Sequence, residues 1–293
     1  MNNKERKKQL YSNIKTSLGF IKKVIKVVKD HNNLKYFLSH TDSQGLKCRD
    51  HLFSLEGLIR LHLKTYSLSS QDFKKSEKML STFKKLEDII GLLSLQVELA
   101  HKSELINKKI QKINVFNFLK LKWSNKKINY YHQQMNSINF KFKKRHIKVM
   151  LKSEINRINE KNKNLKKFIM KNNYDFEILE LGFHEWRRAI RWISIYFQFY
   201  KYSISMITDK NQYKSYINSS PFFNFSLNNK KLIKIDLKSF VKLSNYIYSS
   251  GKIKELVEQS IFLNKKNKKG ILEKKCQSIY LEFNKSRILE KII

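Results

Sequence analysis

Residues 182–200 have the sequence GFHEWRRAIRWISIYFQFY, which combines a cluster of arginines with a run of large apolar side chains. The chain contains nine Arg, and three of them, Arg187, Arg188 and Arg191, lie within five residues here. Elsewhere the positive charge comes mostly from Lys. Arg presents a planar fork of donors that binds phosphate or carboxylate through two hydrogen bonds, whereas Lys presents a point charge. The local use of Arg therefore indicates a site for an anion.

The spacing within this stretch predicts a helix with two unlike faces. At helical spacing His184, Arg187, Arg188 and Arg191 occupy positions i, i+3, i+4 and i+7 and share one face. The opposite face collects apolar residues, which we expect to form core: Trp186, Ala189, Ile190, Ile193, Phe197 and Tyr200. The basic face is predicted to bind an anion.

Acidic residues near the start of this helix leave a second interpretation open. Glu177, Glu180 and Glu185 lie within reach of the arginines along the helix. They could neutralise the arginines in solvated salt bridges, which contribute little to stability and need no ligand.

The composition of the whole chain predicts an all-α protein that binds a polyanion. Its 293 residues include one Pro and seven Gly, too few helix breakers for a β-rich fold with many tight turns. Hydrophobic residues make up 41%, enough to build a core. The net charge of +37 repels itself unless a polyanion neutralises it. A bias toward Lys throughout the chain also explains part of this charge.

Helical periodicity recurs along the chain and predicts about eight helices, arranged as two bundles or one elongated bundle. The expected helices cover 4–30, 49–67, 73–113, 116–172 (two helices, with a break near 140–144), 176–208, 236–263 and 268–292. Residues 31–47, 172–175 and 210–234 are expected to form loops or turns. We divide the chain into an N-terminal helix and loop (1–45) and a helical domain (46–293) with halves at 46–172 and 173–293.

The N-terminal segment 4–30 predicts a basic amphipathic helix. Its apolar residues follow helical spacing: Leu10, Ile14, Leu18, Ile21, Ile25 and Val28. A helix of this kind can lie on an anionic membrane or serve as an organellar transit peptide. We favour a third interpretation, in which the apolar stripe packs on the helical bundle.

The arginine-rich stretch resembles the second signature of the CHAD family, the conserved-histidine α-helical domain. That signature has a His followed by a basic residue at +3 and another near +7, which His184, Arg187 and Arg191 match. The match ends at Ser194, where Arg is common in the family; Ile195 and Gln198 also depart from its pattern.

A weaker counterpart of this signature lies in the first half of the chain. His51 begins a similar helix, with Arg60 and His62 further on, but Ser54 and Leu58 stand where basic residues are expected. Gly91 and Gly251 each lie inside an apolar helical pattern and resemble a degenerate Leu-Gly element of the family. Two such matches suggest a duplicated architecture.

The resemblance implies a fold, a ligand and a set of binding residues. The fold is two antiparallel four-helix bundles related by pseudo-symmetry, with a basic cavity between them. The ligand is inorganic polyphosphate, bound without catalysis. The binding residues carried over are His184, Arg187, Arg188, Arg191, His51, Arg60 and His62.

Several other kinds of chemistry find little support in the sequence. Cys48 and Cys276 lie far apart and form no zinc-binding or disulfide pattern. No cluster of carboxylates and histidines has metal-ligand spacing, and no phosphate loop or nucleophile elbow is present. We therefore expect a non-enzymatic protein without a metal or cofactor. No signal peptide or membrane span is expected, so the predicted location is cytoplasmic, with polyphosphate granules or an organelle as alternatives.

A structural RNA-binding protein, such as a ribosomal protein encoded in an AT-rich genome, remains the alternative function. The segment 107–171 is rich in Lys and contains interleaved aromatic residues, a combination that fits contact with nucleic acid. These aromatics are Trp123, Tyr130, Tyr131, Phe140 and Phe142. Helical spacing equally explains them as core, which we favour. We do not expect a membrane surface as the partner.

Overall fold

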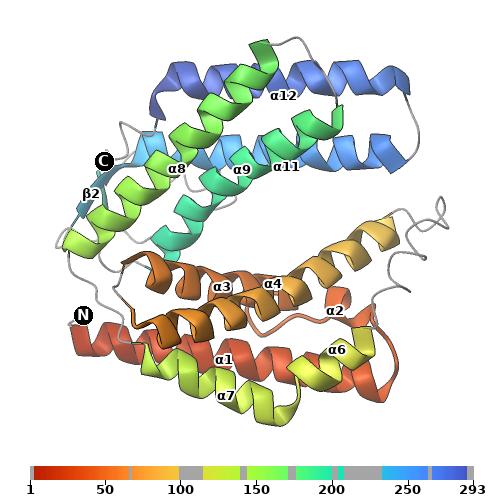
Figure 1. Ribbon diagram of the computed structural model, residues 1–293, viewed down its shortest axis with the longest axis vertical. Helices are drawn as coiled ribbons and strands as arrows, with labels where there is room; N and C mark the ends of the chain where they lie inside the picture. Colours follow the sequence, from red (N-terminus) through yellow and green to blue (C-terminus); the bar gives the residue numbers. More distant parts are fainter. Residues whose placement is uncertain are drawn as a thin grey trace. The chain divides into compact units, whose positions relative to one another are not determined.

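The computed structural model describes residues 3–65, 68–98, 115–138, 144–170, 176–199, 204–207, 233–262 and 266–288 (Figure 1). The described residues form ten helices and one pair of short strands. The predicted all-α fold class is confirmed apart from this pair. The arrangement as two antiparallel four-helix bundles stays a prediction.

The chain divides into two compact units, Met1–Lys141 (unit 1) and Phe142–Ile293 (unit 2). We predicted a division between residues 172 and 173, and a separate N-terminal segment that ends at residue 45. The observed division lies earlier because helix α8 (Lys144–Met170) packs against helix α9 (Phe176–Phe199). The N-terminal helix belongs to unit 1.

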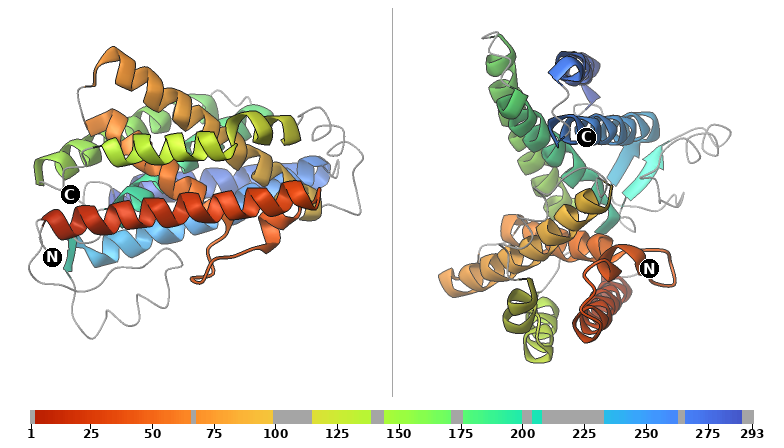
Figure 2. Two further views of the ribbon diagram at one scale, coloured as in Figure 1. Left: turned by 90° about the horizontal axis from the view of Figure 1, so that it is seen from below. Right: turned by 90° about the vertical axis from the view of Figure 1, so that its right-hand side faces the viewer.

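Unit 1 is a set of helices that pack around α1 and α3. Its helices are α1 (Asn3–Asp30), α2 (Tyr36–Ser39), α3 (Cys48–Thr65), α4 (Ser70–Glu98), α6 (Val115–Lys122) and α7 (Asn125–Ser137). Helix α3 packs against both α4 and α1, and α7 lies beside α1 (Figures 1 and 2). The expected helix 73–113 begins at Ser70, and residues 99–114 lie outside the described part.

The apolar stripe of α1 is buried inside unit 1. Leu10, Ile14, Leu18, Ile21, Ile25 and Val28 are each at most 7% exposed, whereas Lys15, Lys22 and Lys26 of the same helix are exposed. The interpretation that this helix packs on the bundle is therefore confirmed. Its apolar side chains are occupied by the protein core and do not face outward.

An aromatic cluster forms the part of the unit 1 core where α6 gives way to α7. The rings of Phe83, Trp123 and Tyr131 lie 5.2–5.4 Å apart, and all three side chains are buried. Ser124 accepts a hydrogen bond from the Lys127 backbone N–H, which caps α7 and separates it from α6. This break was not predicted. The preference for a core role over base stacking is confirmed for Trp123 and Tyr131. It is wrong for Tyr130, which is 37% exposed. Phe140 and Phe142 lie outside the described residues.

The described residues of unit 2 form four helices and the strand pair. Its elements are α8, α9, β1 (Ile204–Ile207), β2 (Ile233–Asp236), α11 (Leu237–Phe262) and α12 (Lys266–Ser286). Helix α9 packs against α8, α11 and α12. The expected helix 176–208 is wrong at residues 204–207, which form β1; this strand pairs in parallel with β2 from Ile204↔Ile233 to Ile207↔Asp236. The pairing partner lies far along the chain, so helical periodicity alone could not reveal it.

Asp236 marks the change from strand to helix in unit 2. Its carboxylate accepts hydrogen bonds from the backbone N–H and the hydroxyl of Ser239, the usual contacts of a residue that caps a helix start.

The core of unit 2 between α9 and α12 is aromatic. Trp186 of α9 is fully buried and meets Tyr280 and Phe283 of α12 edge to face. Helix α9 is thereby fixed with its opposite, basic face directed away from this core.

Candidate anion-binding site

The basic face of α9 carries the residues that the sequence singles out. Helix α9 runs without interruption from Phe176 to Phe199, so His184, Arg187, Arg188 and Arg191 share one side. All four side chains are half-buried. A half-buried cation is less screened by water than one on an open surface, and its interactions with neighbouring charges are stronger.

The other side of α9 is core, as predicted. Trp186, Ala189, Ile190, Ile193 and Phe197 are each at most 1% exposed. Tyr200 lies outside the described residues. Because the apolar side chains anchor α9 along its length, the spacing of the basic residues is set by a well-packed helix.

His184 lies among positive charges and is held in its neutral form. Burial, together with the positive charges of Lys254, Arg188, Arg187 and Arg191, lowers its pKa to about 3. Its Nδ1 atom is buried and has no hydrogen-bond partner within the part of the chain that the structure describes. Four cations therefore surround a histidine that no described carboxylate supports.

Lys254 brings a second helix into this group. It lies on α11, which packs against α9, and among the neighbouring charges it has the largest effect on His184. The sequence analysis did not identify it, because one Lys among many in a Lys-rich chain carries no signal of its own. A usable signal was its position three residues after Gly251, which places both residues on one side of α11.

Arg187 lies directly over Gly251 of α11. A Cβ added to Gly251 would stand 3.1 Å from Arg187 Nη2 and 3.6 Å from Nε. Contacts this close are tighter than most real side chains make, so the absence of a side chain at Gly251 is what leaves room for the guanidinium.

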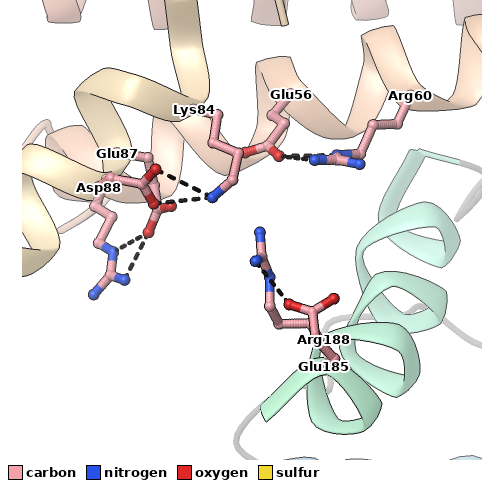
Figure 3. A network of polar contacts seen from close by, with 8 residues as sticks. Glu56, Arg60, Lys84, Glu87, Asp88, Glu185 and Arg188 are labelled. Atoms are coloured by element: carbon pink, nitrogen blue, oxygen red, sulfur yellow. Dashed lines mark hydrogen bonds and ion pairs between the residues drawn. The ribbon is translucent and has the colours of Figure 1, made fainter. Parts of the chain in front are cut away.

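Arg188 has an acidic partner on its own helix. Its Nη1 lies 3.1 Å from Oε1 of Glu185, three residues earlier on α9 (Figure 3). The interpretation in which glutamates neutralise the arginines thus holds for Arg188. The side chains of Glu177 and Glu180 lie outside the described residues.

His51, which we expected to contact the anion, is buried in unit 1 and serves that unit's structure. Its Nδ1 lies 3.0 Å from the hydroxyl of Ser17, and its Nε2 lies 3.0 Å from Oδ2 of Asp42. The other Asp42 oxygen accepts the backbone N–H groups of Gln44 and Leu46. His51 therefore ties the loop before α3 to α1.

The pKa values of His51 and Asp42 follow from their surroundings. Burial lowers the pKa of His51, although Asp42 acts in the opposite direction. Burial raises the pKa of Asp42, but its two backbone donors and His51 outweigh this and hold it below its ordinary value. The contacts among Ser17, Asp42 and His51 could not be predicted, because these residues come from three separate segments of the chain.

The side chains of Arg60 and His62 also lie within unit 1, where Arg60 is hydrogen-bonded and His62 is buried. The Arg60 guanidinium donates two hydrogen bonds, of 2.8 and 2.7 Å, to the buried carboxylate of Glu56 (Figure 3). His62 is 9% exposed, and burial lowers its pKa. In both cases unit 1 itself supplies the environment of the side chain.

A contact like that between Arg187 and Gly251 occurs in unit 1. A Cβ on Gly91 of α4 would stand 3.2 Å from Nη2 of Arg49, which belongs to α3. Here a carboxylate completes the arrangement: Glu87, one turn before Gly91, accepts hydrogen bonds from Arg49 Nε (2.8 Å) and Nη2 (2.6 Å) (Figure 3). The sequence paired Gly91 with Gly251 but did not identify Arg49 or Glu87.

Two further observations bear on the chemistry open to this chain. Among the described residues, no group of three or more His, Cys, Asp or Glu side chains could hold a metal ion. No helix in the described ranges is both long and apolar enough to cross a membrane.

Comparisons of the chain with protein-family models, with curated proteins and with solved structures found no match. The resemblance to CHAD domains, the ligand and the cellular location consequently stay predictions.

Proposed function

We propose that unit 2 binds inorganic polyphosphate through the basic face of α9 and does not catalyse a reaction on it. The carrying observation is the position of His184, half-buried within the influence of Arg187, Arg188, Arg191 and Lys254. Gathering like charges around a partly buried imidazole costs free energy. A bound polyanion would offset that cost and turn the repulsion into attraction.

The donors present on α9 suit phosphate oxygens. Each guanidinium can bind two oxygens at once, and such charge-assisted pairs are about twice as strong as neutral hydrogen bonds. Three arginines over two helical turns therefore match a ligand with many closely spaced acceptors. A chain of phosphates has this property, and the resemblance to CHAD domains supports the same ligand.

The packing of α9 favours a ligand without bases. Proteins that bind single-stranded nucleic acid combine basic grooves with exposed aromatic rings on which bases stack. The described aromatic side chains of α9, including Phe183, Trp192 and Tyr196, are each at most 2% exposed. The face that carries the arginines thus offers charge without a stacking platform, which supports polyphosphate over RNA.

A competition experiment tests this proposal. Long-chain polyphosphate and RNA of equal total charge are titrated against the wild-type protein and an Arg187→Ala/Arg191→Ala variant at one salt concentration, because every polyanion releases counterions. We expect the variant to lose polyphosphate affinity by at least about tenfold, since hydrogen bonds to charged groups contribute about 1.5–3 kcal/mol each. RNA affinity should change little.

The outcome that contradicts the proposal is equally defined. A small and equal loss for both polyanions would show that the net charge of +37, and not the α9 face, carries binding. That result would favour the RNA-binding alternative.

A further inference from the structure

The close contact between α9 and α11 raises the question of how far the anion site extends. The guanidinium of Arg187, a residue of α9, lies next to Gly251 of α11. The positive charge of Lys254, also on α11, lowers the pKa of His184. Residues from two helices thus influence the same small region.

Gly251 has a structural effect that a larger residue could not reproduce. It is buried, and an added Cβ would come within 3.1 Å of the Arg187 guanidinium. A side chain at this position would require the Arg187 guanidinium to shift by a few tenths of an ångström. Since Ala favours helices more than Gly does, helix formation by itself does not explain Gly at this position.

Lys254 follows Gly251 by three residues, so both lie on one side of α11. Its side chain is half-buried, in contrast to the exposed Lys252 on the same helix. Lys252 has its own local contacts, with Glu255 at 3.6 Å and the ring of Tyr248 at 5.7 Å. The two lysines therefore carry the same charge two residues apart but face different surroundings.

We propose that α11 forms a second wall of the polyphosphate site, in which Lys254 binds the anion and Gly251 positions Arg187 for the same ligand. This inference rests on the function proposed above. It specifies the ligand further: a chain of phosphates long enough to contact α9 and α11 together, in preference to a single orthophosphate.

Two matched pairs of variants test the inference in the full-length protein. Lys254→Gln is compared with Lys252→Gln, which removes the same charge from the same helix. Gly251→Ala is compared with Gly91→Ala, which creates a similar contact, at 3.2 Å, with Arg49 in unit 1. Binding of long-chain polyphosphate, tripolyphosphate and orthophosphate is measured for each variant, with urea unfolding as the check on folding.

We expect polyphosphate affinity to fall about tenfold in Lys254→Gln and in Gly251→Ala, the loss typical of one charge-assisted contact. Lys252→Gln and Gly91→Ala should change it less than about twofold, since they alter exposed or unrelated groups. Orthophosphate should bind weakly to every variant. If Gly251→Ala does not fold, the comparison of the two lysines decides the matter.

The results separate this inference from the function on which it rests. Equal effects of Lys254→Gln and Lys252→Gln, combined with a large loss in Arg187→Ala/Arg191→Ala, would overturn the role of α11 and leave a site on α9 alone. No loss in the double arginine variant would overturn the proposed function itself.

Discussion

In unit 1 the guanidinium of Arg49 lies over Gly91, and in unit 2 the guanidinium of Arg187 lies over Gly251. A Cβ added at either glycine would stand at a similar distance from the guanidinium, 3.2 Å in unit 1 and 3.1 Å in unit 2, but the residue one turn earlier differs. Glu87 precedes Gly91 and binds Arg49, whereas Ile247, which is fully buried, precedes Gly251. In unit 1, therefore, a carboxylate binds the guanidinium that lies over the glycine. In unit 2 the position one turn before the glycine holds an apolar side chain instead.

This difference indicates how one structural arrangement can serve two purposes. In unit 1 the carboxylates of Glu56 and Glu87, both nearly fully buried, bind Arg60 and Arg49. Buried ion pairs of this kind need both partners, because removing one leaves a charge uncompensated. In unit 2 the described charges that shift the pKa of His184 are all positive. Unit 1 thus pairs these two arginines with buried carboxylates, and we propose that a bound anion joins the positive charges near His184 in unit 2.

The largest expected effect comes from transferring the carboxylate of unit 1 into unit 2. Ile247→Glu should let a glutamate reach Arg187 as Glu87 reaches Arg49, and polyphosphate affinity should fall more than about tenfold. Ile247→Gln is the matched variant without the charge. Because both changes bury a polar group, both should lower stability. Paired with Arg187, the Glu variant should unfold at a higher urea concentration than the Gln variant. Equal polyphosphate affinities of Ile247→Glu and Ile247→Gln would contradict this comparison of the two units.

The reverse change in unit 1 should reduce stability. Glu87→Gln removes the charge that binds Arg49, and the free energy of unfolding should fall by about 1.5–3 kcal/mol, the contribution of a hydrogen bond to a charged group. The neighbouring Asp88→Asn is the control. Asp88 pairs with Lys84 on the surface, with 55% of its side chain exposed, and should contribute less than about 0.5 kcal/mol. Urea unfolding that ranks the two variants equally would contradict the buried role of Glu87.

A pH titration should distinguish His184 with and without ligand. Its folded-state pKa of about 3 lies below its ordinary value of 6.5, so the neutral form favours folding. Its contribution to stability is complete above pH 6.5 and is lost as the pH falls toward 3. A bound polyanion favours the imidazolium, so polyphosphate affinity should rise several-fold between pH 8 and about 5.5. His184→Gln should bind at pH 8 and lose this pH dependence; an unchanged pH profile would exclude His184 from the site.

The smallest effect is expected for Arg188. Its guanidinium already pairs with Glu185, and this exposed pair at i, i+3 contributes only a few tenths of a kcal/mol. Arg188→Gln should lower polyphosphate affinity less than about threefold, well below the loss in Arg191→Gln. Isothermal titration of the two single variants provides the ranking, and equal losses would show that Glu185 does not neutralise Arg188.

Much of the helix pattern could be predicted because it depends on local periodicity. The α1 stripe and the apolar side of α9 are both confirmed, since a repeat of 3.6 residues places those side chains together whatever else the chain does. The errors lie where distant residues decide. Strand β1 forms because β2 lies beside it, and the boundary of unit 2 falls before α8 because α8 packs on α9.

The candidate site divides in the same way. The spacing of His184, Arg187, Arg188 and Arg191 was sufficient to place them on one side of a helix. It could not show that Lys254 and Gly251 of another helix adjoin them, or that His51 is held by Ser17 and Asp42. These contacts join residues that are 34 to 70 positions apart or belong to different elements, and a local pattern contains no information about them.

The sequence by itself determined the all-α class, the amphipathic helices and the concentration of arginine on one face of α9, because each follows from the order of neighbouring residues. Only the tertiary structure decided which charges acquire partners. Glu87 meets Arg49 and Glu56 meets Arg60 inside unit 1, while α11 brings Lys254 toward His184 in unit 2. The physical reason is that electrostatic interaction depends on distance and burial in space, and packing of the helices sets both.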